Sequence, residues 1–319
     1  MTDTAVIISI DTEYSSGAYA AGHGRNADTA WDLALGCGDA GGVGIAHQMS
    51  LMDQAGIRGT FFVDPMPALV WGQGAIDRVV EPILRAGHDV QLHCHTEWLA
   101  LAPGNGLSEA TGRNIKDFPL ADQQRILAYG IARLEAAGAP RPVAFRAGNY
   151  GANDDTLRAL AALGVAYDSS FPAGLACDCD ISSALGDVRP HNREGVIEVP
   201  IAGIAAGGGM RHAQVTSVSA DEMVAGIRHA AAHEWPAFVM VSHSFELFDR
   251  KRMKPNRIVA RRFAALCDAI GKIDGINPRA GFADVAVDER IAPLPLLPEA
   301  KTRTMRRYAE QALSNVLYG

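Results

Sequence analysis

The chain contains the stretch Gly87-His88-Asp89-Val90-Gln91-Leu92-His93-Cys94-His95-Thr96-Glu97-Trp98. Val90 and Leu92 are apolar and two residues apart, which indicates a strand that buries one face. His93 and His95 have the same spacing, so both imidazoles point to one side of an extended chain, and Glu97 continues that side if the strand persists. Imidazole and carboxylate groups gathered at a strand end are typical of a divalent metal site. The alternative is a pair of structural histidines, which would need polar partners in the core.

Length and composition indicate an ordinary globular protein. The chain has 319 residues, of which 48% are hydrophobic and 20% charged, enough for one large domain or two smaller ones with a sizeable core. The formal net charge is -7, and the body of the chain carries no Lys/Arg-rich run. Nucleic acid is therefore not an expected partner. The sequence defines no oligomeric state.

The cysteines and the first residues predict a reducing location. Five cysteines are scattered and odd in number, which argues against a disulfide framework: Cys37, Cys94, Cys177, Cys179 and Cys267. Residues 1–14 contain neither a basic region nor a long apolar run, so we expect no signal peptide. No stretch approaches the ~18 apolar residues of a membrane span. We expect the protein in the cytoplasm.

Strands and helices are predicted to alternate along the chain. Residues 5–10 form an almost unbroken apolar run, as in a strand buried on both faces. Further predicted strands lie at 59–65, 87–94, 142–146, 165–171, 196–201, 237–241 and 281–287, and predicted helices at 45–55, 75–85, around 126–134, 153–163, 219–233 and 256–270. Irregular segments are expected at 15–42, 101–120, 172–194 and 202–218. The alternation predicts an α/β fold with a parallel sheet.

Polar side chains follow nearly every predicted strand. They are Asp11, Glu13, His93, His95, Arg146, Asp168 and His243. Sites built from successive strand ends are typical of α/β barrels, so we favour barrel closure over an open sheet. No GxGxxG follows the first strand and no GxxxxGK[ST] occurs, which excludes the main nucleotide-binding folds.

This set of side chains suits metal-assisted hydrolysis of an amide or ester. A divalent metal polarises a carbonyl and lowers the pKa of bound water, and a nearby carboxylate can take the proton of that water. His243 can protonate the leaving group, Asp168 can hold its tautomer, and Arg146 can keep the base carboxylate ionised. A serine nucleophile elbow is excluded because the sequence has no GxSxG.

Five short blocks, spanning residues 5 to about 247, resemble the polysaccharide deacetylase family, carbohydrate esterase family 4. The blocks are Ile8-Ser9-Ile10-Asp11-Thr12-Glu13; Gly59-Thr60-Phe61-Phe62-Val63; Gly87 to His93; Phe145 to Gly151 with Leu163-Gly164 and Asp168-Ser169-Ser170-Phe171; and Val239-Met240-Val241-Ser242-His243. Each block is weak alone, but all five occur in the family's order.

The resemblance implies a distorted (β/α)7 barrel that removes N- or O-linked acetyl groups from a carbohydrate or glycoconjugate. It also implies a divalent metal, usually Zn²⁺, with Co²⁺, Ni²⁺ or Mn²⁺ as alternatives. By position, Asp11 would be the general base, Glu13 a metal ligand and His93 the first metal histidine. Arg146 would position the base, and the turn at Tyr150 would supply an oxyanion donor. His243 would be the general acid, tuned by Asp168.

This sequence departs from the family pattern at three points. The adjacent acid pair is here Asp11-x-Glu13, so base and ligand roles could be exchanged. The histidine expected four residues after His93 is here Glu97, so the third ligand is His95 or Glu97, with His95 preferred. One additional residue precedes Tyr150 in the arginine block, which alters the geometry of the oxyanion donor.

Residues 1–290 are predicted to form the barrel, and residues 291–319 a Pro-rich link and an amphipathic helix. The helix either docks on the barrel or a dimer partner, or lies peripherally on a membrane surface. Irregular segments 15–42, 101–120 and 202–218 are expected to shape the substrate cleft, and Trp98 either stacks on a sugar or packs in the core.

Two other functions compete with carbohydrate deacetylation. On the same fold, the enzyme could hydrolyse a non-sugar amide or a cyclic imide. The altered second and third blocks are also compatible with an inactive, carbohydrate-binding relative.

Overall fold

The computed structural model describes residues 3–23, 42–181, 188–249, 254–287 and 293–318. Its central strands are β1 (Thr4–Thr12), β2 (Thr60–Val63), β3 (Asp89–Cys94), β4 (Ala144–Ala147), β5 (Tyr167–Asp168), β7 (Val196–Glu198) and β10 (Ala237–His243), with β6 (His191–Arg193) and β13 (Ile276–Asn277) at the edges. Two smaller antiparallel sheets pair β8 (Gly203–Ala206) with β9 (Gly209–His212) and β11 (Phe248–Asp249) with β12 (Lys254–Pro255).

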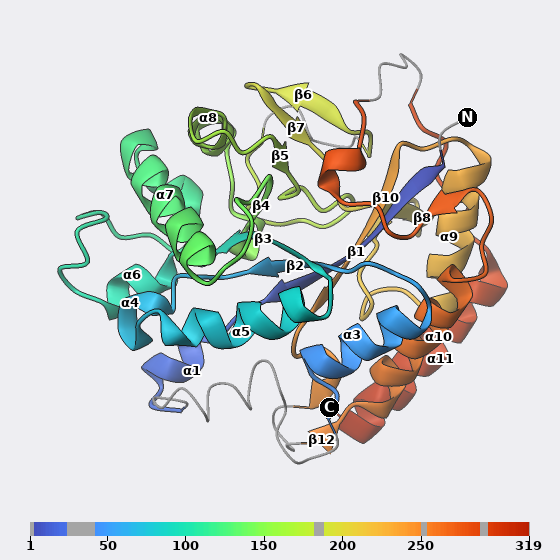
Figure 1. Ribbon diagram of the computed structural model, residues 1–319. Helices are drawn as coiled ribbons and strands as arrows, with labels where there is room; N and C mark the ends of the chain where they lie inside the picture. The colour runs from blue at the N-terminus through green and yellow to red at the C-terminus, as the bar shows by residue number, and fades with distance from the viewer. Residues whose placement is uncertain (1–2, 24–41, 182–187, 250–253, 288–292, 319) are drawn as a thin grey trace.

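Helices surround this sheet (Figure 1). They are α1 (Ser16–Ala20), α3 (Ile45–Gln54), α4 (Ala68–Trp71), α5 (Gly74–Arg85), α6 (Glu97–Leu101), α7 (Leu120–Ala136), α8 (Asp154–Ala162), α9 (Ala220–Ala232), α10 (Arg257–Ile270) and α11 (Lys301–Tyr318), with 3-10 turns η2 (Ile115–Asp117), η3 (Gly148–Tyr150) and η4 (Phe282–Asp284). Among the described residues, no helix is both long and apolar enough to cross a membrane.

The sheet curls into a distorted barrel. The strand order is β10-β1-β2-β3-β4-β5-β7-β6, and every neighbouring pair in it except β6-β7 is parallel. The chain after β7 closes the ring, because Ile201 forms parallel bridges to Pro172 and Val239 and the Ala202 N–H donates to the Val239 carbonyl at 2.9 Å. The prediction of a distorted (β/α) barrel is confirmed.

Strand β1 lies between β10 and β2 in the barrel wall, and all nine of its residues are buried. Its apolar side chains include Ile7, Ile8 and Ile10, which are fully buried. A strand flanked by parallel neighbours and covered by helices on its outer face has no solvent side, which explains its unbroken apolar run. The first predicted strand is therefore confirmed and extends to Thr12.

Three segment predictions are wrong at least in part. Residues 202–218, expected to be irregular, contain the β8–β9 hairpin, whose turn is Gly207-Gly208 with φ of 59° and 80°. Two glycines tolerate the left-handed conformation of such a two-residue turn, so the glycines form a hairpin rather than a loop. Residues 281–287 form no strand: Asp284 accepts a hydrogen bond from Gly281 N–H at 2.8 Å and closes the η4 turn. Irregular segment 172–194 also ends in the short strand β6.

Candidate active site

Strand register brings the predicted site residues to one end of the barrel. Asp11 on β1 is paired with His243 on β10, and His93 on β3 with Arg146 on β4. Because these strands are parallel, their carboxyl ends meet at the same rim. A cavity of about 90 Å³ opens there. It is lined by Asp11, Glu13, His93, His95, Ala147, Asn149, Tyr150 and His243.

Three side chains in this cavity can hold one metal ion. Ligand atoms of Glu13, His93 and His95 all lie within 4.8 Å of one another. Glu13 Oε2 lies 3.3 Å from His93 Nε2 and also contacts His95 Nε2. Two imidazole nitrogens and a carboxylate oxygen, open to a cavity, are a donor set that can hold a divalent metal ion.

Electrostatics within this group also suit a cation. Burial by itself raises the pKa of Glu13, but the imidazoles of His95 and His93 hold the pKa well below its usual value. Burial lowers the pKa of His95, yet the carboxylates of Glu13 and Glu97 raise it well above its usual value. Without metal, Glu13 is therefore ionised and the His95 imidazole carries the proton, so the Glu13 carboxylate already neutralises a positive charge at this place.

Both imidazoles are oriented by hydrogen bonds at their other nitrogen. His93 Nδ1 donates to the Arg146 carbonyl at 2.7 Å, and His95 Nδ1 lies 3.2 Å from Glu97 Oε2. Glu97 in turn accepts a hydrogen bond from Asn149 Nδ2 at 2.9 Å. Such partners fix the tautomer and leave Nε2 free to bind a metal. The predicted ligand Glu97 thus contacts the back of His95 and is absent from the metal-binding group among the described residues.

Asp11 is bound by a buried arginine. Arg146 Nη1 donates to Asp11 Oδ1 at 2.6 Å and to Ser9 Oγ at 2.9 Å. The guanidinium is fully buried, donates through Nε to the Ser169 carbonyl at 3.0 Å, and lies 4.3 Å above the Phe62 ring. These contacts fix the guanidinium, which balances the negative charge of Asp11 and aims its carboxylate at the cavity.

His243 lies on the other side of Asp11. Its Nε2 is 3.9 Å from Asp11 Oδ2, and its Nδ1 is 2.9 Å from Glu246 Oε1. Burial lowers the pKa of His243, but Glu246 and then Asp11 raise it to about 9. Glu246 itself is held by Ser242 Oγ at 2.9 Å and by Gln214. His243 is therefore protonated at neutral pH and can donate a proton into the cavity.

The expected partner of His243 was Asp168, and the contacts contradict this. Asp168 is fully buried, accepts hydrogen bonds from Ser170 N–H and Oγ at 2.9 and 2.7 Å, and is joined to the Glu198 side chain. Burial raises the pKa of Glu198 well above its usual value, and Asp168 raises it further, so Glu198 stays protonated and donates to Asp168. Asp168 belongs to strand β5, whereas His243 is the last residue of β10, and the extension of β7 lies between these two strands.

Tyr150 lies on the cavity wall in an unusual backbone conformation. Asn149 and Tyr150 have φ of 55° and 57°, in the left-handed region that few residues other than glycine adopt. The preceding Gly148 lies so close to β3 that an added Cβ would be 2.6 Å from the Cys94 carbonyl oxygen and 2.8 Å from the His95 ring. The Tyr150 hydroxyl is buried and has no hydrogen-bond partner among the described residues. A strained turn and an unpaired donor beside the cavity indicate a functional role.

Sequence reasoning missed Asp64, which follows β2. Asp64 Oδ1 accepts from Met66 N–H at 3.1 Å, and Oδ2 accepts from Trp98 Nε1 at 3.1 Å. Burial raises its pKa to about 6. Trp98 is fully buried and packs against Trp71 with ring centroids 5.3 Å apart, so it belongs to the core and not to the substrate surface. Glu246 was missed as well, although its position three residues after His243 was a usable signal.

A second hollow of about 180 Å³ adjoins the metal-binding group. It is lined by Glu13, Tyr14, Ser15, Ser16, His95, Glu97 and Phe245. Of the segments expected to shape the cleft, the beginning of 15–42 does line this hollow, while residues 24–41 lie outside the described structure. A separate hollow of about 330 Å³ is formed by residues between Thr96 and Phe118.

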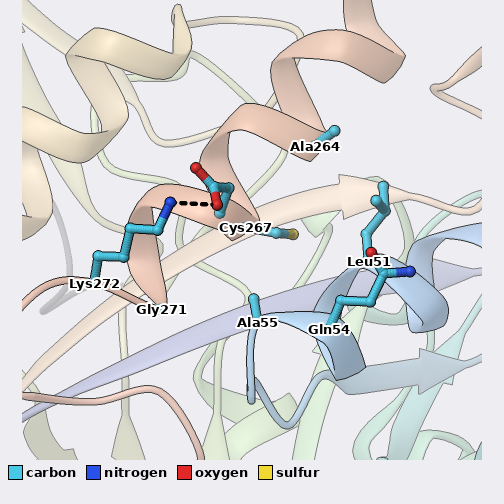
Figure 2. A pocket seen from close by; sticks show the side chains of 8 residues that line it. Leu51, Gln54, Ala55, Ala264, Cys267, Gly271 and Lys272 are labelled. Atoms are coloured by element: carbon cyan, nitrogen blue, oxygen red, sulfur yellow. Dashed lines mark hydrogen bonds and ion pairs between the residues drawn. The ribbon is translucent and has the colours of Figure 1, made fainter.

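A further hollow of about 200 Å³ lies between α3 and α10 and is not part of this site. Figure 2 shows Cys267 of α10 and Lys272, which follows that helix, near Leu51 and Gln54 of α3 and the adjoining Ala55. Lys272 Nζ donates to Asp268 Oδ1 at 2.6 Å. Burial raises the pKa of the Cys267 thiol to about 12, so the thiol is unreactive at neutral pH. Among the described residues, no group of metal-binding side chains lines this hollow.

Comparison with solved structures identifies the fold. A Mycobacterium smegmatis protein assigned as a polysaccharide deacetylase matches with a TM-score of 0.54 and 19% identity over 87% of each chain. A Streptomyces lividans family 4 carbohydrate esterase in complex with acetate matches with a TM-score of 0.40 and 11% identity over 86% of this chain and 92% of that one. The first of these matches shows that the chain has the polysaccharide deacetylase fold.

A different enzyme class shares the barrel. The 4-alpha-glucanotransferase of Thermococcus litoralis matches with a TM-score of 0.52 and 10% identity, over 89% of this chain but 40% of that one. No protein-family model matches the sequence, and no curated protein does. Since one barrel hosts different reactions, the reaction must be argued from the site.

Proposed function

We propose that this chain is a metal-dependent hydrolase that removes N- or O-linked acetyl groups from a carbohydrate or glycoconjugate. One observation supports the proposal above all: a group able to hold a metal (Glu13, His93 and His95) shares a cavity with Asp11 on one side and a protonated His243 on the other. That is the arrangement needed to activate water and to protonate a leaving group across one carbonyl.

The metal would be held by Glu13 Oε2 and by Nε2 of His93 and His95. When bound, a divalent ion such as Zn²⁺ supplies Lewis acidity toward the acetyl carbonyl and lowers the pKa of water. Glu97 would orient His95, and the Arg146 carbonyl would orient His93. In this assignment Glu13 is the ligand and Asp11 the base, because only Glu13 contacts both imidazoles and Asp11 contacts Arg146 instead.

Two proton transfers complete the reaction. Asp11 accepts a proton from the attacking water while Arg146 balances the charge of the carboxylate. His243, charged through its contact with Glu246, donates a proton to the sugar nitrogen or oxygen as its bond to the acetyl carbon breaks. Acetate and the free amine or hydroxyl are the products. The unpaired donor of Tyr150 is available to the developing negative charge on the acetyl oxygen.

Acetate release tests this proposal. The full chain, loaded with Zn²⁺, is incubated with N-acetylated amino-sugar oligomers and with O-acetylated sugars. We expect acetate release that falls by about 10²- to 10⁴-fold in Asp11→Asn, the loss expected for a general base. Asp155→Asn, on the half-exposed start of α8, is the control and should match the original chain.

Each alternative predicts a different result. If the chain hydrolyses cyclic imides and releases no acetate from any sugar, the same residues act on a non-sugar substrate. An inactive carbohydrate-binding relative would give a third result. The chain would bind sugar saturably, would not bind Zn²⁺ tightly or at Glu13, and would hydrolyse neither class of substrate.

A further inference from the structure

Helix α11 presents its apolar side outward. It lies on the outside of α10 at the rim of the molecule (Figure 1). Among the described residues, six large apolar side chains are exposed, and all but Val143 lie on this helix. They are Met305 (71% exposed), Tyr308, Leu313, Val316 (80% exposed) and Leu317. Such a concentration on one element marks an interaction surface.

The inward side of α11 is polar and charged. Arg307 is almost completely buried and lies 3.6 Å from Glu222 of α9, and Glu310 Oε2 accepts from Arg262 of α10 at 2.7 Å. Arg306 also pairs with Asp221 of α9. These ion pairs fix which face of the helix meets the body. The apolar stripe, whose burial is the usual source of helix stability, has no partner in the described part of the chain.

The apolar stripe is symmetric about its own centre. Met305, Ala309, Ala312 and Val316 follow one another at spacings of four, three and four residues, with Tyr308 and Leu313 beside them. An antiparallel copy rotated about the midpoint of the helix would place Met305 against Val316, Tyr308 against Leu313 and Ala309 against Ala312. Small alanines at the centre allow close approach, and the large residues cover both ends. A patch that complements itself in this way is the requirement for a two-fold interface.

We propose that α11 docks on α11 of a second copy of this chain, as an antiparallel helix pair with two-fold symmetry. Charge favours this occupant over an anionic membrane. The chain carries a formal net charge of -7, and Arg306 and Arg307 are already paired with acids of the barrel. The cations Lys301 and Arg303 lie at the beginning of the helix, so an antiparallel copy brings them to the partner's carboxyl end, the negative end of its dipole.

Size sets the expected affinity. A helix of 18 residues is about 27 Å long, and one such pair is small for a protein–protein interface. We therefore expect micromolar rather than nanomolar dimerisation.

Sedimentation of the full chain tests the proposal. Between about 1 and 200 µM, the range that brackets a micromolar Kd, the mass should rise from that of a 33.8 kDa monomer toward twice that value. In Ala312→Arg each copy contributes one positive charge to the centre of the helix pair, so the chain should stay monomeric. Ala162→Arg makes the same change at the exposed end of α8 and should dimerise like the original chain. An original chain that stays monomeric at the highest concentration, or an Ala312→Arg variant that still dimerises, would overturn the proposal.

Cysteine crosslinking tests the antiparallel register. Met305→Cys mixed with Val316→Cys should form a disulfide-linked dimer, while either variant alone should give only the background of the native cysteines, because like positions lie far apart in this pairing. Efficient crosslinking of either variant alone would contradict the antiparallel register. Flotation with phosphatidylglycerol vesicles tests whether α11 binds a membrane instead. If the chain is monomeric and floats with the vesicles, and Ala312→Arg does not float, the partner of α11 is a lipid surface and the dimer proposal is wrong.

Discussion

The His95 imidazole is held by Glu97 at Nδ1, 3.2 Å away, and faces Glu13 with Nε2. Glu97 stands where the family pattern has a second histidine, yet it contacts that imidazole rather than the metal-binding group among the described residues. A carboxylate that accepts a hydrogen bond from a ligand imidazole orients the ring and raises the metal affinity, but it does not itself bind the metal.

Glu97→Gln should therefore weaken Zn²⁺ binding by about 10- to 100-fold, the usual loss for such an orienting partner. His93→Ala, which removes a proposed ligand, should cost far more. Affinity is measured by competition with a chelating dye. Glu109→Gln, an exposed glutamate in the following loop, is the matched control. A Glu97→Gln loss as large as that of His93→Ala would make Glu97 a ligand after all.

Zn²⁺ should also stabilise the folded chain. At a free concentration of 100 times Kd, binding adds about 2.7 kcal/mol to the free energy of unfolding, so the melting temperature should rise with added metal and fall on chelation. Glu13→Gln should abolish the rise. Differential scanning calorimetry measures both, and an equal rise in Glu13→Gln would show that the ion binds elsewhere.

Arg146→Met should destabilise the fold strongly. It leaves the Asp11 carboxylate buried without its cation, which costs about 3–5 kcal/mol in free energy of unfolding. Adding Asp11→Asn should recover part of the loss, since the unpaired charge is then gone. Arg158→Met removes an exposed arginine with its surface pairs and should remain near the original stability. Urea unfolding measures all four chains, and a small loss in Arg146→Met would refute the buried pair.

The alkaline limit of activity should depend on Glu246. His243 acts as an acid only when protonated, and its pKa is raised to about 9, so activity is present below that pH and is lost as pH rises through it. Glu246→Gln removes the largest cause that raises this pKa, so the limit should move down by roughly one to three units.

Asp168→Asn serves as the comparison for Glu246, because Asp168 has no recorded contact with His243 in the described structure and the limit should stay in place. The pH profile of kcat/KM decides between the two carboxylates. If the alkaline limit moves in Asp168→Asn and not in Glu246→Gln, Asp168 is the partner of His243, as the sequence predicted.

Trp98→Phe should affect stability and not substrate binding. The change removes the donor to the buried Asp64, which costs about 1–3 kcal/mol when the acceptor is left unpaired. KM should be unchanged because Trp98 is fully buried. A higher KM at unchanged stability would instead show that Trp98 contacts the sugar.

The fold was largely predictable from sequence because its signals are local. The apolar run of β1, the helix pattern at α5 and α10, and the polar residues after each strand depend only on neighbouring positions. The same polar residues identified Asp11, Glu13, His93 and His95 as candidates, since parallel strands collect their carboxyl ends at one rim. The Gly207-Gly208 hairpin was missed because glycines specify a turn only when the strands beside them pair.

The sequence by itself determined the barrel and the residue types at its rim. Tertiary structure decided which of them touch. The sequence left both His95 and Glu97 as candidates for the third ligand, with His95 preferred. The start of α6 directly after β3 places the Glu97 carboxylate behind the imidazole. Likewise, Glu246 rather than Asp168 reaches His243 because the turn after β10 folds back on that ring, while Asp168 is enclosed with Glu198 on neighbouring strands. A side-chain contact is a matter of a few ångströms, and those distances are set by how distant segments pack.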